Sequence, residues 1–159
     1  EPLRFGSVAE NVLSERQAPV LTVNPQVPAP EAINIRKIMC PVDMAPESEW
    51  ALNYAAELAG AYGAELFVIH VTDDRAQPAD KLSELCSWVP EKTKETCELR
   101  QIVRLGDTVG EILNAAKELN SDLIVMGVAH KLFEDKTFGE NTYNVLRSAP
   151  CPVITVPRI

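Results

Sequence analysis

Two short segments carry the residue types that could hold a small ligand, because each directly follows an apolar run. Pro41–Ala45 contains Asp43 and begins at the end of the apolar run Ile35–Val42. Gly127–His130 begins at the last residue of the run Asp122–Gly127. If both runs are strands of one parallel sheet, these segments lie at its carboxyl edge, where ligands bind beside the point at which the strand order reverses. Asp43 would then either contact a ligand or simply cap the turn after its strand.

Histidine and cysteine residues offer two further chemistries. His130 could bind a phosphate or a metal, but a single loop histidine is more often solvated, and His70 lies within an apolar run typical of a core strand. No zinc-ligand spacing occurs, so we expect no structural metal. Cys86 and Cys97 could form a regulatory disulfide or supply a reactive thiol, although no cationic cluster accompanies them and packing is the competing interpretation.

Composition narrows the class of protein. The 159 residues carry a formal net charge of −8, with 46% hydrophobic and 24% charged residues. Nucleic-acid binding requires clustered Lys and Arg, so nucleic acid is not an expected partner. No apolar run approaches the ~20 residues of a membrane span. Four cysteines without framework spacing fit a reducing compartment, which makes the cytoplasm the default location.

Strand-like and helix-like patterns alternate along most of the chain. Apolar runs predict strands, and apolar residues at helical spacing predict helices between them. The expected strands are Ile35–Val42, Glu65–Val71, Glu98–Leu105, Asp122–Gly127 and Val153–Val156; the expected helices are Ser48–Tyr62, Asp80–Trp88, Val109–Leu119 and Asn141–Arg147, with a loop or short turn at Pro90–Glu95. Gly63 is placed to end the first helix, and Gly106-Asp107-Thr108 to begin the third.

This alternation predicts an α/β fold, because strands whose sequences are continuous apolar runs are buried on both faces of a sheet by helices. We expect a five-stranded parallel doubly wound sheet, with strand order 3-2-1-4-5 and helices on both faces.

An internal duplication precedes this domain. Residues 5–23 align without a gap on residues 138–156 at a constant offset of 133, and nine of the nineteen positions are identical. Repetition at a fixed period indicates duplication, here of a last helix and strand. The expected organisation is therefore 1–23 as the end of a truncated first domain, 24–34 as a Pro-rich linker, and 35–159 as a complete domain. The absence of an initiator Met fits a fragment of a tandem protein.

The order of motifs resembles the universal stress protein family. Pro41-Val-Asp43 closes the first strand, His70-Val71 ends the second, Asp122-Leu-Ile-Val-Met-Gly127 forms the fourth, and Cys151-Pro-Val153 leads into the last. The resemblance covers residues 35–159 throughout and 5–23 for the duplicated piece. The layout resembles that of bacterial tandem members.

The resemblance implies an adenine-nucleotide site. Its candidate residues are Pro41, Val42, Asp43, Val71, Met126, Gly127, His130, Gly139, Glu140, Asn141 and Thr142. ATP-binding members carry Gly, two residues, Gly, nine residues, then Gly-Ser or Gly-Thr, because glycines let main-chain N–H groups approach phosphates. This chain departs from that pattern in three ways. His130 stands where the second glycine is expected, and eight residues, not nine, separate it from Gly139. Glu140 stands where the pattern has Ser or Thr.

The Glu140 carboxylate would lie against a phosphate. At ~4 Å and an effective dielectric constant near 20, two like charges cost about 4 kcal/mol. That cost corresponds to about three orders of magnitude in affinity. We therefore expect ATP or AMP to bind only weakly in this domain. The duplicated piece keeps Gly6-Ser7, so the missing first domain is the better candidate for nucleotide binding.

The expected function is a non-catalytic, adenine-nucleotide-linked stress or regulatory protein. One alternative is a weak ATPase at the same cleft, which would need a base and a phosphate cradle, with Glu140 or His130 as one of them. The other is a redox-responsive protein acting through Cys86 and Cys97. The strands Val20–Val23 and Val153–Val156 are expected to pair with each other. Pairing within the chain would join this domain to its own first domain, and pairing between two copies would form a homodimer.

Overall fold

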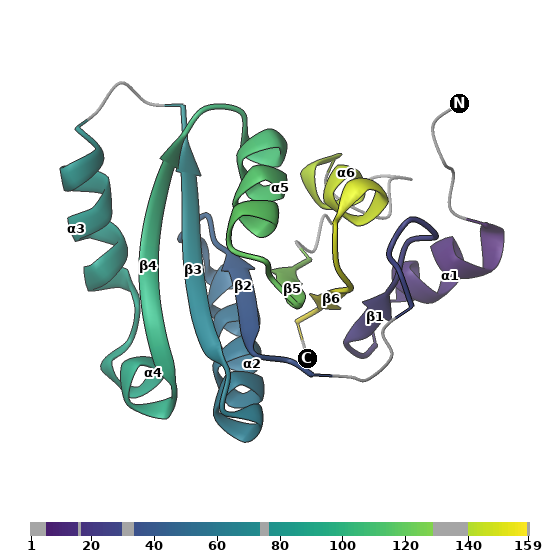
Figure 1. Cartoon of the computed structure of the whole chain (residues 1–159), viewed down its shortest axis with the longest axis horizontal. Coiled ribbons are helices and arrows are strands. Elements are labelled where there is room, and N and C mark those ends of the chain that lie inside the picture. The colour runs from purple at the N-terminus through teal and green to yellow at the C-terminus, as the bar shows by residue number, and fades with distance from the viewer. Residues whose placement is uncertain (1–5, 16, 30–33, 74–76, 129–139, 159) are drawn as a thin grey trace.

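The computed structural model describes residues 6–15, 17–29, 34–73, 77–128 and 140–158. These residues form six helices and six strands (Figure 1). The helices are α1 (Ser7–Glu15), α2 (Pro46–Tyr62), α3 (Pro78–Trp88), α4 (Glu91–Thr96), α5 (Thr108–Glu118) and α6 (Glu140–Ser148). The strands are β1 (Val20–Thr22), β2 (Lys37–Pro41), β3 (Glu65–Thr72), β4 (Glu98–Leu105), β5 (Leu123–Gly127) and β6 (Val153–Val156).

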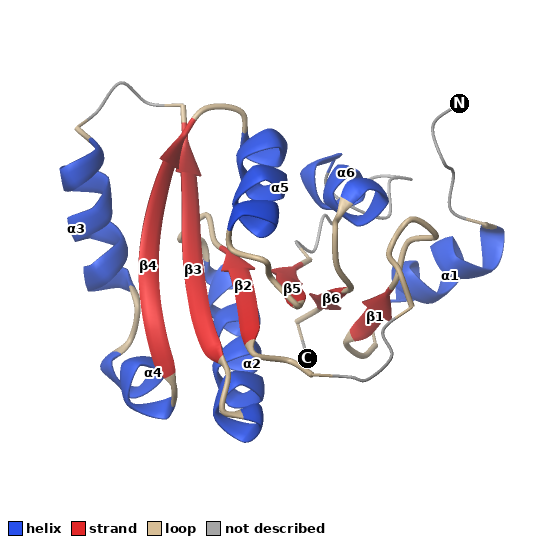
Figure 2. Cartoon of the chain, viewed as in Figure 1, coloured by secondary structure: helices blue, strands red, loops and turns tan. Residues whose placement is uncertain are grey.

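All six strands join in one sheet, with the order β1-β6-β5-β2-β3-β4 (Figure 2). β2 to β6 are parallel to one another, and among themselves they follow the predicted order 3-2-1-4-5. The sheet is larger than the predicted one by a sixth strand, because β1 pairs antiparallel with β6. The register places Val20 opposite Thr155 and Thr22 opposite Val153.

Helices cover both faces of the sheet, as the continuous apolar runs predict. One core contains Met39, Phe67 and Ile124 from the strands, with α5 and α6 packed on that face. The other contains Ile38 and Val68, with α2 and α3 on the opposite face. Strand residues thus alternate between two cores, and this alternation fixes which side chains reach each side of the sheet.

Local sequence signals set several helix ends. α2 has Pro46 in its first turn, and Gly63 follows it in the left-handed conformation (φ 64°), as predicted. α5 is capped by Asp107, whose Oδ2 accepts a hydrogen bond from the Gly110 N–H at 2.8 Å. The loop or short turn predicted over Pro90–Glu95 is instead a short helix, because Glu91–Thr96 forms α4. There Lys94 Nζ donates to the Cys86 carbonyl at 3.0 Å, a contact with α3 that a local pattern does not reveal.

The duplicated segment packs against the domain that follows it. Leu13 of α1 is buried in the same core as α6. After β1, the Asn24 side chain is also buried, and its Nδ2 donates to the Ala149 carbonyl at 2.6 Å. Packed structure therefore continues past β1 into the first residue of the predicted linker.

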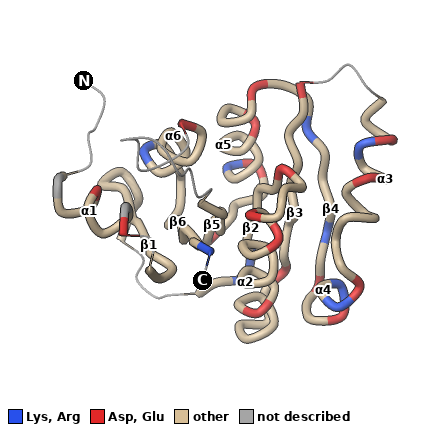
Figure 3. The backbone as a smooth tube through the Cα atoms, turned by 180° about the vertical axis from the view of Figure 1, so that it is seen from behind, with Lys and Arg blue, Asp and Glu red and all other residues tan. Residues whose placement is uncertain are grey.

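Charged residues are distributed over several elements (Figure 3). Some of the basic side chains pair with carboxylates, as Arg104 does with Glu111 and Glu118. The Glu118 contact raises the pKa of Arg104 and lowers that of Glu118, in both cases chiefly through their hydrogen bond. Within the described ranges, no helix has the length and apolar character needed to cross a bilayer.

Candidate functional site

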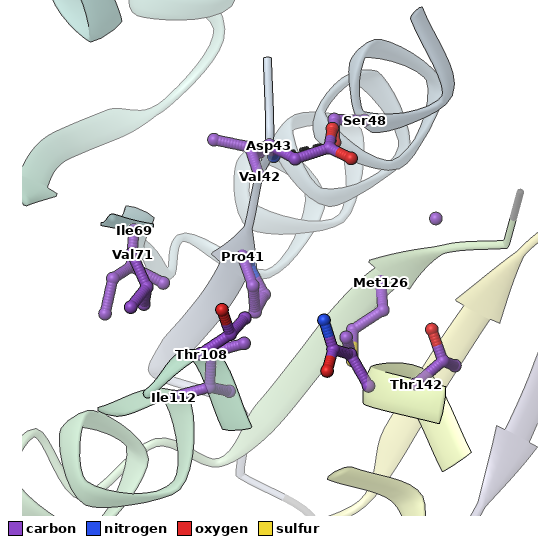
Figure 4. Close-up of a pocket in the computed structure, with 12 residues that line it drawn as sticks. Pro41, Val42, Asp43, Ser48, Ile69, Val71, Thr108, Ile112, Met126 and Thr142 are labelled. Atoms are coloured by element: carbon purple, nitrogen blue, oxygen red, sulfur yellow. Dashed lines mark hydrogen bonds between the residues drawn. The ribbon is translucent and has the colours of Figure 1, made fainter. Parts of the chain in front are cut away.

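A pocket of about 220 Å³ lies at the carboxyl ends of β2, β3 and β5 (Figure 4). β2 and β5 are hydrogen-bonded neighbours on either side of the point where the strand order reverses. The N-terminal turns of α5 and α6 form another wall. The pocket is lined by Pro41, Val42, Asp43, Ser48, Ile69, Val71, Thr108, Ile112, Met126, Gly127, Asn141 and Thr142.

Most of the residues nominated from the sequence come together here. Eight of the eleven line the pocket: Pro41, Val42, Asp43, Val71, Met126, Gly127, Asn141 and Thr142. Glu140 does not; it begins α6, and its side chain is exposed. His130 and Gly139 lie outside the described residues.

Four lining residues were not nominated, and three of them had a readable signal. Ile69 lies two positions before Val71, so strand alternation puts both on the same face. Thr108 follows the Asp107 cap, and Ile112 lies four residues later on the same helical face. Ser48 carries no such signal, because its place depends on how the turn after β2 folds.

The turn after β2 is held by the Asp43 side chain. Asp43 Oδ1 accepts hydrogen bonds from the Ala45 N–H at 2.9 Å and the Ser48 hydroxyl at 2.5 Å. The Asp43 N–H donates to Ser48 Oγ at 3.0 Å. Capping thus accounts for Oδ1, and no described residue hydrogen-bonds to Oδ2. The same carboxylate can cap the turn and still offer one oxygen to a ligand.

Gly127 allows β5 and α2 to approach closely at the edge of the pocket. A Cβ at this position would lie 2.6 Å from the backbone oxygen of Glu47, which is closer than such atoms approach in proteins. Only a residue without a side chain fits between the end of β5 and the first turn of α2. Gly127 therefore determines how closely the two pocket walls approach each other.

The α6 N-terminus supplies the polar end of the pocket. The first N–H groups of a helix have no partner within the helix, and together with the helix dipole they favour an anion. Asn141 and Thr142 belong to this first turn and line the pocket. An anionic group of a ligand would lie best at this end.

The other chemistries considered from the sequence concern metal ions and cysteine thiols. No group of three or more His, Cys, Asp or Glu side chains there could hold a metal ion. Cys40, Cys86, Cys97 and Cys151 are free thiols. Burial raises the pKa of Cys97, which reduces the thiolate that would react. Burial also raises the pKa of Cys40 to about 12.

The chain thus has a doubly wound α/β sheet with a pocket at its switch point. The sequence model described as "Universal stress protein family" matches residues 34–157, so the chain belongs to this family. Universal stress protein A homolog 1 of Coxiella burnetii is 25% identical over 145 residues, which cover 78% of this chain and 97% of that protein.

Solved structures agree with this assignment. A universal stress protein from Archaeoglobus fulgidus DSM 4304 is 26% identical with a TM-score of 0.81, and the match covers all of this chain but 58% of that one. Another universal stress protein, crystallised in complex with cAMP, is 20% identical with a TM-score of 0.64, covering 79% of this chain and 98% of that one. At that identity the likeness shows the fold alone.

Proposed function

We propose that this domain binds an adenine nucleotide at the pocket between β2 and β5 and does not hydrolyse it. The observation that carries the proposal is the convergence of eight nominated residues, distant in sequence, around one pocket. The apolar side chains Val42, Val71 and Met126 suit a base, and Asp43 Oδ2 is open to a ribose or amino group. The cAMP complex of the relative supports an adenine nucleotide as the ligand class for this fold.

The pocket favours a ligand with few phosphates. Its volume of about 220 Å³ is below the about 300–1,000 Å³ of sites that enclose drug-sized ligands. In this proposal the single phosphate of AMP occupies the α6 N-terminus, and the additional phosphates of ATP add negative charge near the exposed Glu140 carboxylate. Because water screens an exposed charge, the repulsion at ~4 Å falls from about 4 toward about 1 kcal/mol. We therefore expect AMP to bind at least as tightly as ATP.

The ionisable groups of the pocket argue against catalysis. Asp43 is the one titratable side chain among the described lining residues, and its Oδ1 is already bonded to Ala45 and Ser48. A general base must lie within hydrogen-bond reach of the proton it abstracts. In the proposed complex the remaining oxygen, Oδ2, faces the ribose or amino group and not the phosphates. The weak-ATPase alternative would need Glu140, which does not line the pocket, or His130. The redox alternative is weakened by the raised pKa of Cys97.

Calorimetric titration of ATP, AMP, cAMP and GTP into residues 1–159, with Mg²⁺ present, tests the proposal. We expect heat from the adenine nucleotides, with AMP at least as tight as ATP, and no phosphate release. Asp43→Asn should weaken the affinity for AMP by about 10- to 100-fold, since a hydrogen bond to a charged group contributes about 1.5–3 kcal/mol to binding. Asp80→Asn, an exposed carboxylate on α3, is the matched control. Absence of heat from every nucleotide would refute the proposed function.

We also propose that residues 1–23 are the last helix and strand of a preceding domain of the same kind, joined by the segment 24–34. Three observations support this organisation. The segment repeats residues 138–156, β1 pairs with its own counterpart β6, and the match to the Archaeoglobus fulgidus protein covers all of this chain but only part of that longer one. A homodimer is the alternative assembly, and sedimentation equilibrium of the 1–159 chain distinguishes a monomer from a dimer.

A further inference from the structure

The turn that presents Asp43 is strained. Met44, directly after Asp43, has a φ of 63°, in the left-handed region that non-glycine residues rarely adopt. Its side chain packs against the core on the α2 face of the sheet. Strained backbone persists only where the surroundings determine it, and it gathers at functional sites. The question is therefore which contacts hold this turn in place.

One set of contacts comes from α2. Ser48 is buried and bonds to both the N–H and the Oδ1 of Asp43. These bonds hold the turn from its C-terminal side. They also fix the Asp43 carboxylate so that Oδ1 is used within the turn.

The other set comes from β3 and acts on Val42, the residue before Asp43. The Val42 N–H donates to the Ile69 carbonyl at 2.8 Å. His70 Nδ1 lies 2.9 Å from the Val42 carbonyl oxygen. A carbonyl oxygen only accepts hydrogen bonds, so Nδ1 carries the proton in this contact. Both polar backbone groups of Val42 are therefore held by consecutive residues of β3.

His70 does not line the pocket that Ile69 and Val71 line. Successive strand residues point to opposite faces of a sheet, so His70 projects away from these two neighbours. His70 lines a neighbouring pocket, which shares Val71 and Thr108 with the first. Its contact with the carbonyl oxygen of Val42 is what links it to the turn that holds Asp43.

We propose that His70 is a positioning residue, which holds the Val42–Asp43 backbone so that Asp43 Oδ2 stays available to the ligand. This inference rests on the proposed nucleotide site. In this inference β3 helps nucleotide binding by fixing the backbone of Val42, in addition to the side chains that contact the nucleotide. His70→Leu removes the Nδ1–H donor, whereas in His70→Asn the amide N–H₂ takes its place.

Calorimetric titration of AMP into the full 1–159 chain tests the assignment. His70→Leu should weaken AMP by about 3- to 10-fold, the range expected for one neutral hydrogen bond. His70→Asn should stay within about twofold of the unchanged chain. The matched control is Thr96→Val, which removes an exposed hydrogen bond to the Lys92 carbonyl on α4.

The same variants in an Asp43→Asn background show whether His70 acts through Asp43. If it does, His70→Leu adds no further loss there, because the carboxylate it positions is already gone. An equal loss in both backgrounds, or equal losses for Leu and Asn, would overturn the proposal.

If the unchanged chain binds no nucleotide, the proposed function fails, and hydrogen exchange then tests His70 alone. His70→Leu should speed exchange of the Asp43 and Ala45 amides, and His70→Asn should restore protection. Unchanged exchange in His70→Leu would contradict the positioning role.

Discussion

Gly127→Ala should destabilise the fold and damage the pocket at the same time. The added Cβ would lie 2.6 Å from the Glu47 backbone oxygen and 3.2 Å from its carbonyl carbon. Backbone atoms cannot swing aside as a flexible side chain can, so α2 must shift relative to β5. Overpacking of this kind costs about 1–3 kcal/mol. For a chain of this length, about 2–4 °C in Tm accompanies each kcal/mol, so we expect a fall of about 2–12 °C.

Urea denaturation followed by circular dichroism measures this cost. Gly6→Ala is the matched control, because a Cβ there meets nothing within 4 Å, and its free energy of unfolding should change by less than about 0.5 kcal/mol. AMP titration of Gly127→Ala should also show weaker binding, since Glu47 lies in the first turn of α2, beside the turn that holds Asp43. Equal stability of the two variants would show that α2 yields freely, and would refute the close-approach argument.

The remaining predictions concern charge, packing and burial. Glu140→Ser should raise ATP affinity about fivefold while changing AMP less, because it removes about 1 kcal/mol of screened repulsion; calorimetry measures both. Leu13→Ala should cost about 2–5 kcal/mol in urea denaturation, whereas Val12→Ala, at a half-exposed position of the same helix, should cost less than about 0.5 kcal/mol. The Cys40 thiol, with its pKa raised to about 12, should resist iodoacetamide at pH 8 until urea unfolds the chain, as peptide mapping by mass spectrometry would show.

The fold could be predicted because its strands have an unambiguous pattern. A strand buried on both faces is apolar along its length, and Leu123–Gly127, within the predicted strand Asp122–Gly127, has that pattern. α4 lacked such a signal, because Glu91-Lys-Thr-Lys-Glu-Thr96 has no apolar periodicity. Its helix is stabilised by the burial of Thr93 and by the bond from Lys94 to α3. Both are tertiary contacts, which a local pattern does not contain.

For the candidate site, the sequence predicted which residues lie at the strand ends but not how their side chains are held. The switch-point rule and the family resemblance located Asp43 and Gly127, because both follow directly from strand ends. The hydrogen bonds of Ser48 to the turn and of His70 to Val42 were not predictable, since they are tertiary contacts around a turn whose backbone is left-handed at Met44. A left-handed residue is usually glycine or asparagine, so a methionine at this position gives no indication of that backbone conformation. The geometry of the turn therefore had to come from the structure.

The duplicated helix and strand show how the same sequence acquires different burial in two settings. Val145 of α6 is fully buried, whereas its counterpart Val12 of α1 is 50% exposed. Val156 of β6 is 3% exposed and its counterpart Val23, just after β1, is 52% exposed. Leu13 and its counterpart Leu146 are both buried, in the same core. Val145 packs in the core on the α5 and α6 face of the sheet, and Val156 packs in the core on the α2 and α3 face. If a preceding domain of the same kind is present, as we propose, the exposed Val12 and Val23 are expected to lie on the surface that it covers.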